Sequence, residues 1–165
     1  MGGLLEQGEH YRSKYENALQ TMPAWITRYL DIPYRHLGTS IEKGIDCGNL
    51  CATVIKEQTG EDVGYKTSDF CDIVDEDWYK KTHQHIFDEF FKNEKYGMIE
   101  VDNLQPFDII IMSIGSTNIS NHCSLYIGNG KMLQTMINHN SWIAPYGKWY
   151  QRYTTGKFRW KNFNF

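Results

Sequence analysis

The spacing of hydrophobic residues changes along the chain, from steps of three and four residues in the first part to alternation in the second. Helical spacing occurs in residues 15–30, 47–59 and 76–95, and this period is typical of a helix with one buried face. Pro23 suits a first helical turn, so we expect a second helical piece to begin there. The residue before a proline is driven out of the helical region, which predicts that this piece ends at residues 31–33.

The helix predicted over residues 47–59 has the clearest boundaries. Asp46 is a favourable N-cap, and Gly60 can adopt the left-handed conformation that ends a helix. One side of this helix should face the core. The positions on that side are Cys47, Leu50, Cys51, Val54, Ile55 and Gln58.

Short apolar or alternating runs follow, separated by turn residues. They cover residues 108–112, 122–127 and 131–137, with weaker examples at 141–144 and 158–160. Helices followed by several short strands with tight turns are typical of an α+β domain with an antiparallel sheet. We predict this fold class in a single domain, because 165 residues suffice for one hydrophobic core.

Composition and charge argue against several functional classes. The net charge is −3 and Lys and Arg do not cluster, so no nucleic-acid partner is expected. No apolar stretch is long enough to span a membrane, and the first 30 residues lack the apolar segment of a secretory signal. Four cysteines without a Cys-x-x-Cys pair predict free thiols, and we expect neither a metal nor a cofactor.

Cys47 is the candidate nucleophile. Cysteine reacts as the thiolate, and the unpaired N–H groups and dipole at a helix N-terminus stabilise that anion. The same N–H groups could stabilise an oxyanion on an attacked carbonyl. We interpret Cys51, Cys71 and Cys123 as structural. Cys123 in particular points to the opposite face of its strand from His122.

His122 is the candidate base. It begins an alternating strand whose polar face includes Ser124. A catalytic histidine needs a third group that fixes its tautomer, and the carbonyl oxygen of Gln134 can accept the ring N–H. Alternative partners lie in the following turn; they are Asn138, His139 and Asn140.

Strand parity makes the Gln134 hypothesis testable. A two-residue loop at residues 129–130 would place Gln134 on the face opposite to His122. A three-residue loop, with Gly130 in the left-handed conformation beside a bulge, would place it opposite Ser124 on the His122 face. The triad hypothesis therefore predicts the three-residue loop.

Four motifs, taken in order, resemble the NlpC-type family of papain-like cysteine peptidases. That family has a Tyr in a glycine-containing loop, Asp-Cys-Ser-Gly-Leu at a helix start, Leu-x-Pro-Gly-Asp before a strand, and His-x-Gly-Ile-Tyr-x-Gly-x-Gly. The matching stretches are residues 33–38, 46–50, 104–108 and 122–130. Gln134 falls where the family has a third polar residue, about twelve positions past the histidine. The resemblance covers roughly residues 30–152.

The resemblance implies a papain-like NlpC-type domain, over residues 31–165, in which the nucleophile helix packs on a central antiparallel sheet. It also implies that Cys47 attacks, His122 is the base and Gln134 orients it. Tyr34 would help to hold the oxyanion or the substrate. The oxyanion and substrate side of the site would comprise Tyr34, Asp46, Gly48, Asn49 and Ser124.

Several features depart from the family pattern. Asn49, Phe107 and Ser124 stand where the family has glycine. The segment between the nucleophile helix and the first strand is long, so we expect a helical insertion at about residues 61–103. Residues 1–30 have no counterpart and are interpreted as a helical extension.

Two further groups have weaker patterns. The aromatic tail is mainly core and strand by its pattern, although Tyr146, Trp149 and Tyr150 could line a groove wall. Four histidines have no partner pattern and are interpreted as surface or loop residues. They are His10, His36, His83 and His85.

Members of the family mostly cut peptide bonds in peptidoglycan stem peptides without a metal. The first hypothesis is therefore a cysteine endopeptidase that acts on stem peptides through a thioester acyl-enzyme. A missing secretory signal would be explained if the chain is made in a host cytoplasm and delivered to the cell wall in a bacteriophage tail tip, with other tail proteins as partners.

Two alternatives belong to other classes. Asn49 and Phe107 motivate a catalytically silent structural or assembly subunit of a phage tail. An amidase or acyltransferase of the same superfamily would use the same site residues on a different amide.

Overall fold

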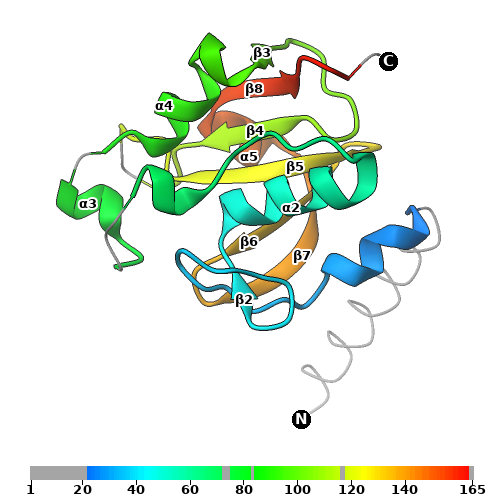
Figure 1. The fold of residues 1–165 in the computed structure, drawn as a ribbon, viewed down its shortest axis with the longest axis horizontal. Helices are drawn as coiled ribbons and strands as arrows, with labels where there is room; N and C mark the ends of the chain where they lie inside the picture. Colours follow the sequence, from blue (N-terminus) through cyan, green and yellow to red (C-terminus); the bar gives the residue numbers. More distant parts are fainter. Residues whose placement is uncertain (1–21, 72–74, 83, 116–117, 164–165) are drawn as a thin grey trace.

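The computed structural model describes residues 22–71, 75–82, 84–115 and 118–163. The apolar pattern before residue 22 lies outside these ranges, as do His10 and His83. Two helices cover opposite faces of an antiparallel sheet, and the short helices α3 (Trp78–Thr82) and α4 (Ile86–Phe91) lie at one side of it (Figure 1). The predicted α+β class with an antiparallel sheet is confirmed.

The main sheet has six strands in the order β3-β8-β4-β5-β6-β7, and each neighbouring pair is antiparallel. The strands are β3 (Met98–Glu100), β4 (Ile109–Met112), β5 (His122–Gly128), β6 (Lys131–Met136), β7 (His139–Pro145) and β8 (Thr154–Trp160). A small hairpin of β1 (Thr39–Ser40) and β2 (Gly44–Ile45) precedes the sheet. β4 is buried along its whole length because it lies inside the sheet and both of its faces are covered.

Helix α2 (Cys47–Thr59) has the predicted bounds and covers one face of the sheet (Figure 1). The Asp46 carboxylate accepts the first-turn N–H of Asn49 at 2.8 Å, and Gly60 ends the helix with φ 78°. These two signals work locally, so the sequence pattern alone predicts where the helix begins and ends.

Helix α5 (Lys148–Tyr153) covers the other face and was not predicted. Its sequence is rich in aromatic residues and has no clear helical period. Aromatic side chains of this helix both contact one another and pack on the sheet. The face beneath it contains Ile110, Met112 and Met132. This face and the α2 face alternate along each strand, as the period of two requires.

The insertion is not the single helix expected over residues 76–95. It contains α3 (Trp78–Thr82), α4 (Ile86–Phe91) and the 3-10 turn η3 (Glu94–Tyr96). His85 has a non-helical backbone (φ −107°, ψ 55°), and the Thr82 hydroxyl accepts the N–H of Gln84 at 3.3 Å. The apolar period continues across this break because both helices bury aromatic side chains in one cluster: rings of α4 pack on Tyr65, and Trp78 of α3 packs on Phe87.

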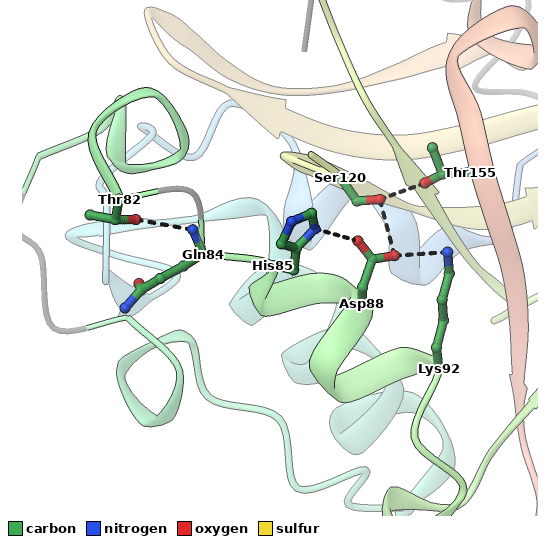
Figure 2. Close-up of polar contacts among 7 residues, drawn as sticks. All are labelled: Thr82, Gln84, His85, Asp88, Lys92, Ser120 and Thr155. Carbon is green, nitrogen blue, oxygen red and sulfur yellow. Dashed lines mark hydrogen bonds and ion pairs between the residues drawn. The ribbon is translucent and has the colours of Figure 1, made fainter. Parts of the chain in front are cut away.

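One carboxylate joins the insertion to the sheet. Asp88 of α4 accepts a hydrogen bond from Ser120 at 3.3 Å, and Ser120 is bonded to Thr155 of β8 at 2.7 Å. Figure 2 shows these contacts, together with Lys92 and His85 on the other sides of the carboxylate. Ser120 lies just before β5, so α4 is held next to the start of that strand.

The loop of the β5–β6 hairpin differs from the prediction. Asn129 and Gly130 form a two-residue loop, with φ of 52° and 69°, between the paired residues Gly128 and Lys131. The expected three-residue loop is therefore wrong, although Gly130 does have the left-handed conformation.

The register that the triad hypothesis needed arises in another way. A β-bulge between Tyr126 and Gly128 adds one residue to β5. The pairing shifts by one residue beyond it, and Gln134 shares its face with His122. A bulge and a three-residue loop change the parity equally, because each adds one unpaired residue to the same hairpin.

The segment before the sheet is packed onto it. The 3-10 helix η1 (Ala24–Tyr29) begins after Pro23, as predicted, and Ile26 and Tyr29 are buried. Trp25 stacks on Phe107, with ring centroids 5.5 Å apart and planes 21° apart. Phe107 has a left-handed backbone (φ 72°), which is unfavourable for a bulky residue, so the stacking helps to hold this conformation.

Candidate active site

A cleft of about 120 Å³ opens where the N-terminus of α2 meets the start of β5. Cys47, His122 and Tyr34 line it. The other lining residues are His36, Asp46, Thr67, Glu76, Trp78, Tyr79, Ile86, Phe87, Ile114, Asn121, Thr135, Met136 and Ile137.

The structure brings the three predicted triad residues together. Cys47 opens α2 and lines the same cleft as His122, the first residue of β5, which lies close enough to lower the pKa of the thiol. His122 Nε2 is 2.8 Å from Gln134 Oε1, so the ring N–H donates to the amide oxygen. Because Gln134 occupies Nε2, Nδ1 is the ring nitrogen that remains for the thiol. Gln134 thus takes the role of the third group, for which residues 138–140 were the alternatives.

The surroundings of Cys47 favour the thiolate. A hydrogen bond from the Cys123 thiol is the largest influence that lowers the Cys47 pKa well below its usual range, and His122 lowers it further. Burial of the sulfur opposes both effects. A deprotonated sulfur beside an imidazole is the reactive state of a thiol nucleophile.

Cys123 is therefore closer to the chemistry than its sequence position suggested. As predicted, it lies on the α2 face of β5, opposite to His122. On that face its sulfur contacts both Cys47 and, at 3.9 Å, Cys51. Strand parity predicts the face, but only the packing of α2 on β5 shows which helix residue the thiol meets. All four cysteines are free thiols, as predicted.

Asp46 and Asn49 support the start of the helix, and of the two only Asp46 lines the cleft. The two carboxylate oxygens of Asp46 accept from the backbone and side-chain N–H groups of Asn49, at 2.8 and 3.0 Å. The Asn49 amide also donates to Gly38 O at 3.0 Å, and its oxygen accepts from Thr67 N at 3.4 Å. Asn49 does not line the cleft. The prediction that it contacts substrate is wrong, because these buried partners hold its side chain.

Two more of the predicted substrate residues lie outside the cleft. At Gly48, an added Cβ would be 2.3 Å from the Tyr65 ring, so glycine is required there for close packing. Ser124 is fully buried and its hydroxyl contacts Met132 Sδ at 3.1 Å under α5. Ser124 does share the His122 face, as strand parity predicted, but residues of α5 cover that face there, and Gly48 is covered by Tyr65.

Tyr34 lies in the cleft, as the resemblance implied. It forms an isolated parallel bridge with Ile45, one residue before Asp46. Burial, and next the Cys47 thiolate, raise the pKa of the Tyr34 phenol. The phenol is therefore protonated at neutral pH and can donate a hydrogen bond to an oxyanion.

Sequence reasoning missed several lining residues. Trp78 and Phe87 come from the insertion, and His36, interpreted as a surface or loop residue, also lines the cleft. No period links these residues to Cys47, so their position depends on how the insertion folds. Conversely, Tyr146, Trp149 and Tyr150 do not line the cleft, and the groove-wall interpretation is wrong.

Two negative findings apply to the described ranges. No group of three or more His, Cys, Asp or Glu residues there could hold a metal ion. None of the helices there has both the length and the apolar character needed to cross a bilayer.

A helix-borne thiol beside a sheet-borne imidazole, with an amide behind the ring, is an arrangement that thiol hydrolases use. A family model described as the NlpC/P60 family matches residues 31–159. The chain belongs to the NlpC/P60 family.

Solved structures agree with this fold. The NlpC/p60 domain of peptidoglycan hydrolase SagA is 17% identical with a TM-score of 0.51, and the match covers 81% of this chain and 91% of that domain. A family protein from Bacillus cereus is 23% identical (TM-score 0.50) over 80% of this chain and 36% of its own. A lipoprotein-like member from Staphylococcus aureus is 14% identical (TM-score 0.52), with 80% and 37% covered. The chain spans little more than a third of the last two. No curated protein sequence matches the chain.

Proposed function

We propose that this protein is a cysteine endopeptidase that cleaves peptidoglycan stem peptides through a thioester acyl-enzyme. The placement of Cys47 and His122 in one cleft, with Gln134 bonded behind the ring, carries the proposal. Membership of the NlpC/P60 family and the likeness to the peptidoglycan hydrolase SagA support the substrate class.

The geometry supports a two-step reaction. The Cys47 thiolate attacks the peptide carbonyl, and the N–H groups at the start of α2, together with the Tyr34 phenol, stabilise the oxyanion. His122 then gives its proton to the leaving amine, and the C–N bond breaks to leave a thioester. In the second step His122 takes a proton from water, whose oxygen attacks the thioester, and Cys47 leaves as the thiolate.

The two departures from the family pattern that prompted the hypothesis of a catalytically silent subunit have structural explanations. Asn49 is held by Asp46, Gly38 and Thr67 outside the cleft. Phe107 stacks on Trp25 of the segment before the sheet. Neither departure from the family pattern touches the triad, so we favour the enzyme.

A sacculus digestion tests the proposal. The native protein should release new amino groups from purified sacculi, whereas a Cys47→Ala variant should release none above background. A Cys71→Ser variant is the matched control, because it removes a different buried thiol and should retain the activity.

Mass analysis of the released fragments identifies the bond. Products that differ by one peptide cleavage support the endopeptidase, while loss of the bond to the glycan or transfer to an added amine would identify an amidase or an acyltransferase. A Cys47→Ala variant that releases as much as the native protein would contradict the mechanism.

The location in a phage tail stays a prediction from the sequence, with other tail proteins as partners. Mass spectrometry of purified virions and of isolated tails is the direct measurement. The chain should be present in both preparations at a fixed ratio to the tail proteins. Recovery of the chain only from the lysate and not from particles would overturn the predicted location in a phage tail.

A further inference from the structure

The amide of Gln134 is held at both ends. Its oxygen accepts from His122 Nε2 at 2.8 Å, and its nitrogen donates to the Tyr150 hydroxyl at 2.8 Å. Gln134 is fully buried, so water does not provide a substitute partner for either end. Tyr150 lies on α5, which covers this face of the sheet (Figure 1).

The orientation of this amide matters for the proton on His122. An amide can rotate by half a turn with little change in shape, which exchanges its oxygen and its NH2 group. In the rotated state the NH2 group would face the ring N–H, and two donors would meet. The imidazolium that forms when Cys47 ionises would then lose its acceptor.

We propose that Tyr150 is a positioning residue: its hydroxyl is the partner of the buried Gln134 NH2 group and so holds this side chain in place, with its oxygen against His122. By doing so it stabilises the ion pair of the Cys47 thiolate and the His122 imidazolium. For turnover this inference rests on the proposed function, but the ion pair itself can be measured without a substrate.

Helix α5 is built to present this hydroxyl. Trp149 packs edge-on against Tyr150 and Tyr153, with ring centroids 4.8 and 5.0 Å apart. The Thr154 hydroxyl donates to the carbonyl of Tyr150 at 3.0 Å and is also bonded to the Tyr146 hydroxyl at 2.7 Å. Tyr146→Phe therefore removes a hydroxyl hydrogen bond of this region without touching Gln134.

The first experiment measures alkylation of Cys47 by iodoacetamide across pH, followed on the Cys47 peptide by mass spectrometry. In Tyr150→Phe the pH at which the alkylation rate is half-maximal should rise. A less stabilised His122 imidazolium holds its proton less well, so the Cys47 thiolate forms only at higher pH. Alkylation near pH 6 should slow by about five- to tenfold, as expected for one lost hydrogen bond. Tyr146→Phe should keep the native profile. An unchanged profile in Tyr150→Phe would overturn the inference.

A double-mutant cycle separates positioning from general loss of stability. In a Gln134→Ala background, Tyr150→Phe should have no further effect on the profile, because its partner is gone. Effects that simply add would show that Tyr150 acts independently of Gln134 and would also overturn the inference. Sacculus digestion by the same variants is scored separately. An inactive native protein with a low-pH alkylation midpoint would contradict the proposed function and not the role of Tyr150.

Discussion

At the level of single residues, Asp46 has two tasks that oppose each other. Its carboxylate caps α2 through Asn49, yet it is buried beside the anionic nucleophile. Burial and, next, the Cys47 thiolate raise the pKa of Asp46 to about 7, although the hydrogen bond from the Asn49 backbone opposes the shift. The folded protein therefore binds a proton at Asp46 more tightly than the unfolded chain does.

This raised pKa predicts how stability changes with pH. Between about pH 4 and 7 only the folded state holds the proton, so the free energy of unfolding should fall as pH rises. The difference between the ordinary 3.8 and about 7 sets an upper limit of roughly 4 kcal/mol for this effect. An Asp46→Asn variant should flatten the slope, because asparagine also caps helices and does not ionise. Urea unfolding at several pH values measures it.

Asp62→Asn is the control for that comparison. The pKa of Asp62 is lowered by Lys56, and the carboxylate lies on the surface. Its replacement should therefore leave the fall of the unfolding free energy between about pH 4 and 7 unchanged. Parallel curves of unfolding free energy against pH for the native protein and Asp46→Asn would show that Asp46 does not cause the pH dependence.

At the level of secondary structure, the insertion forms part of the cleft, and α4 links it to the start of β5. Ile86 and Phe87 of this helix line the cleft, and Asp88 of the same helix bonds Ser120, two residues before His122 (Figure 2). The insertion and the catalytic strand are thus joined by a short polar path. This arrangement places residues of the insertion in the wall of the cleft that also contains Cys47 and His122.

Replacing Asp88 by alanine should change binding more than chemistry. Without the bond to Ser120 and the ion pair with Lys92, α4 should lose its fixed position beside the cleft. We expect the KM for a soluble stem peptide to rise by roughly three- to tenfold, with kcat within about twofold, because removing one hydrogen-bonded contact costs about 1 kcal/mol.

Glu89→Ala on the same helix is the control, because Glu89 is exposed and should leave both constants unchanged. A fall in kcat with KM unchanged in Asp88→Ala would instead show that Asp88 acts on the triad through Ser120.

At the level of the whole molecule, the fold is closed by contacts between distant parts of the chain. Ser141 of β7 donates to Tyr29 O at 2.6 Å and accepts from Ile32 N at 2.9 Å, which fastens the segment before the site to the sheet. Asp108 at the start of β4 is fully buried and pairs with Arg159 of β8 at 2.7 Å. Each contact joins segments more than fifty residues apart.

Ser141→Ala tests how much the hydrogen bonds of the Ser141 hydroxyl contribute to stability. The substitution leaves a buried carbonyl and a buried N–H without the hydroxyl partner, so the free energy of unfolding should fall by about 2–3 kcal/mol. Denaturation by urea measures the loss. Ser68→Ala, at an exposed position, should change stability by no more than about 0.5 kcal/mol. A loss in Ser141→Ala no greater than this would show that the hydroxyl contributes little and that the backbone hydrogen bonds from Asp31 to Ser141 and from Ser141 to Ile32, together with packing, hold this segment to β7.

The features that depend on neighbours in the chain were predictable. The bounds of α2 follow from an N-cap, a helical period and a terminal glycine, and β4, β5 and β6 follow from alternation between turns. The choice of Cys47 and His122 rests on the same local logic, because each begins a predicted element. Their residue types, placed at the ends of a helix and a strand, indicate a thiol site before any coordinates are known.

Contacts between separate elements depended on the tertiary structure. A bulge in β5, and not the expected loop, turned Gln134 toward His122, and α5 then supplied Tyr150 behind it. The packing of α2 on β5 brought Cys123 to the nucleophile, and buried partners drew Asn49 away from the cleft. Periodicity tells which face of an element is apolar but not which element will cover it. Patterns in the chain therefore determined the elements and the reactive residues, and packing decided what surrounds them.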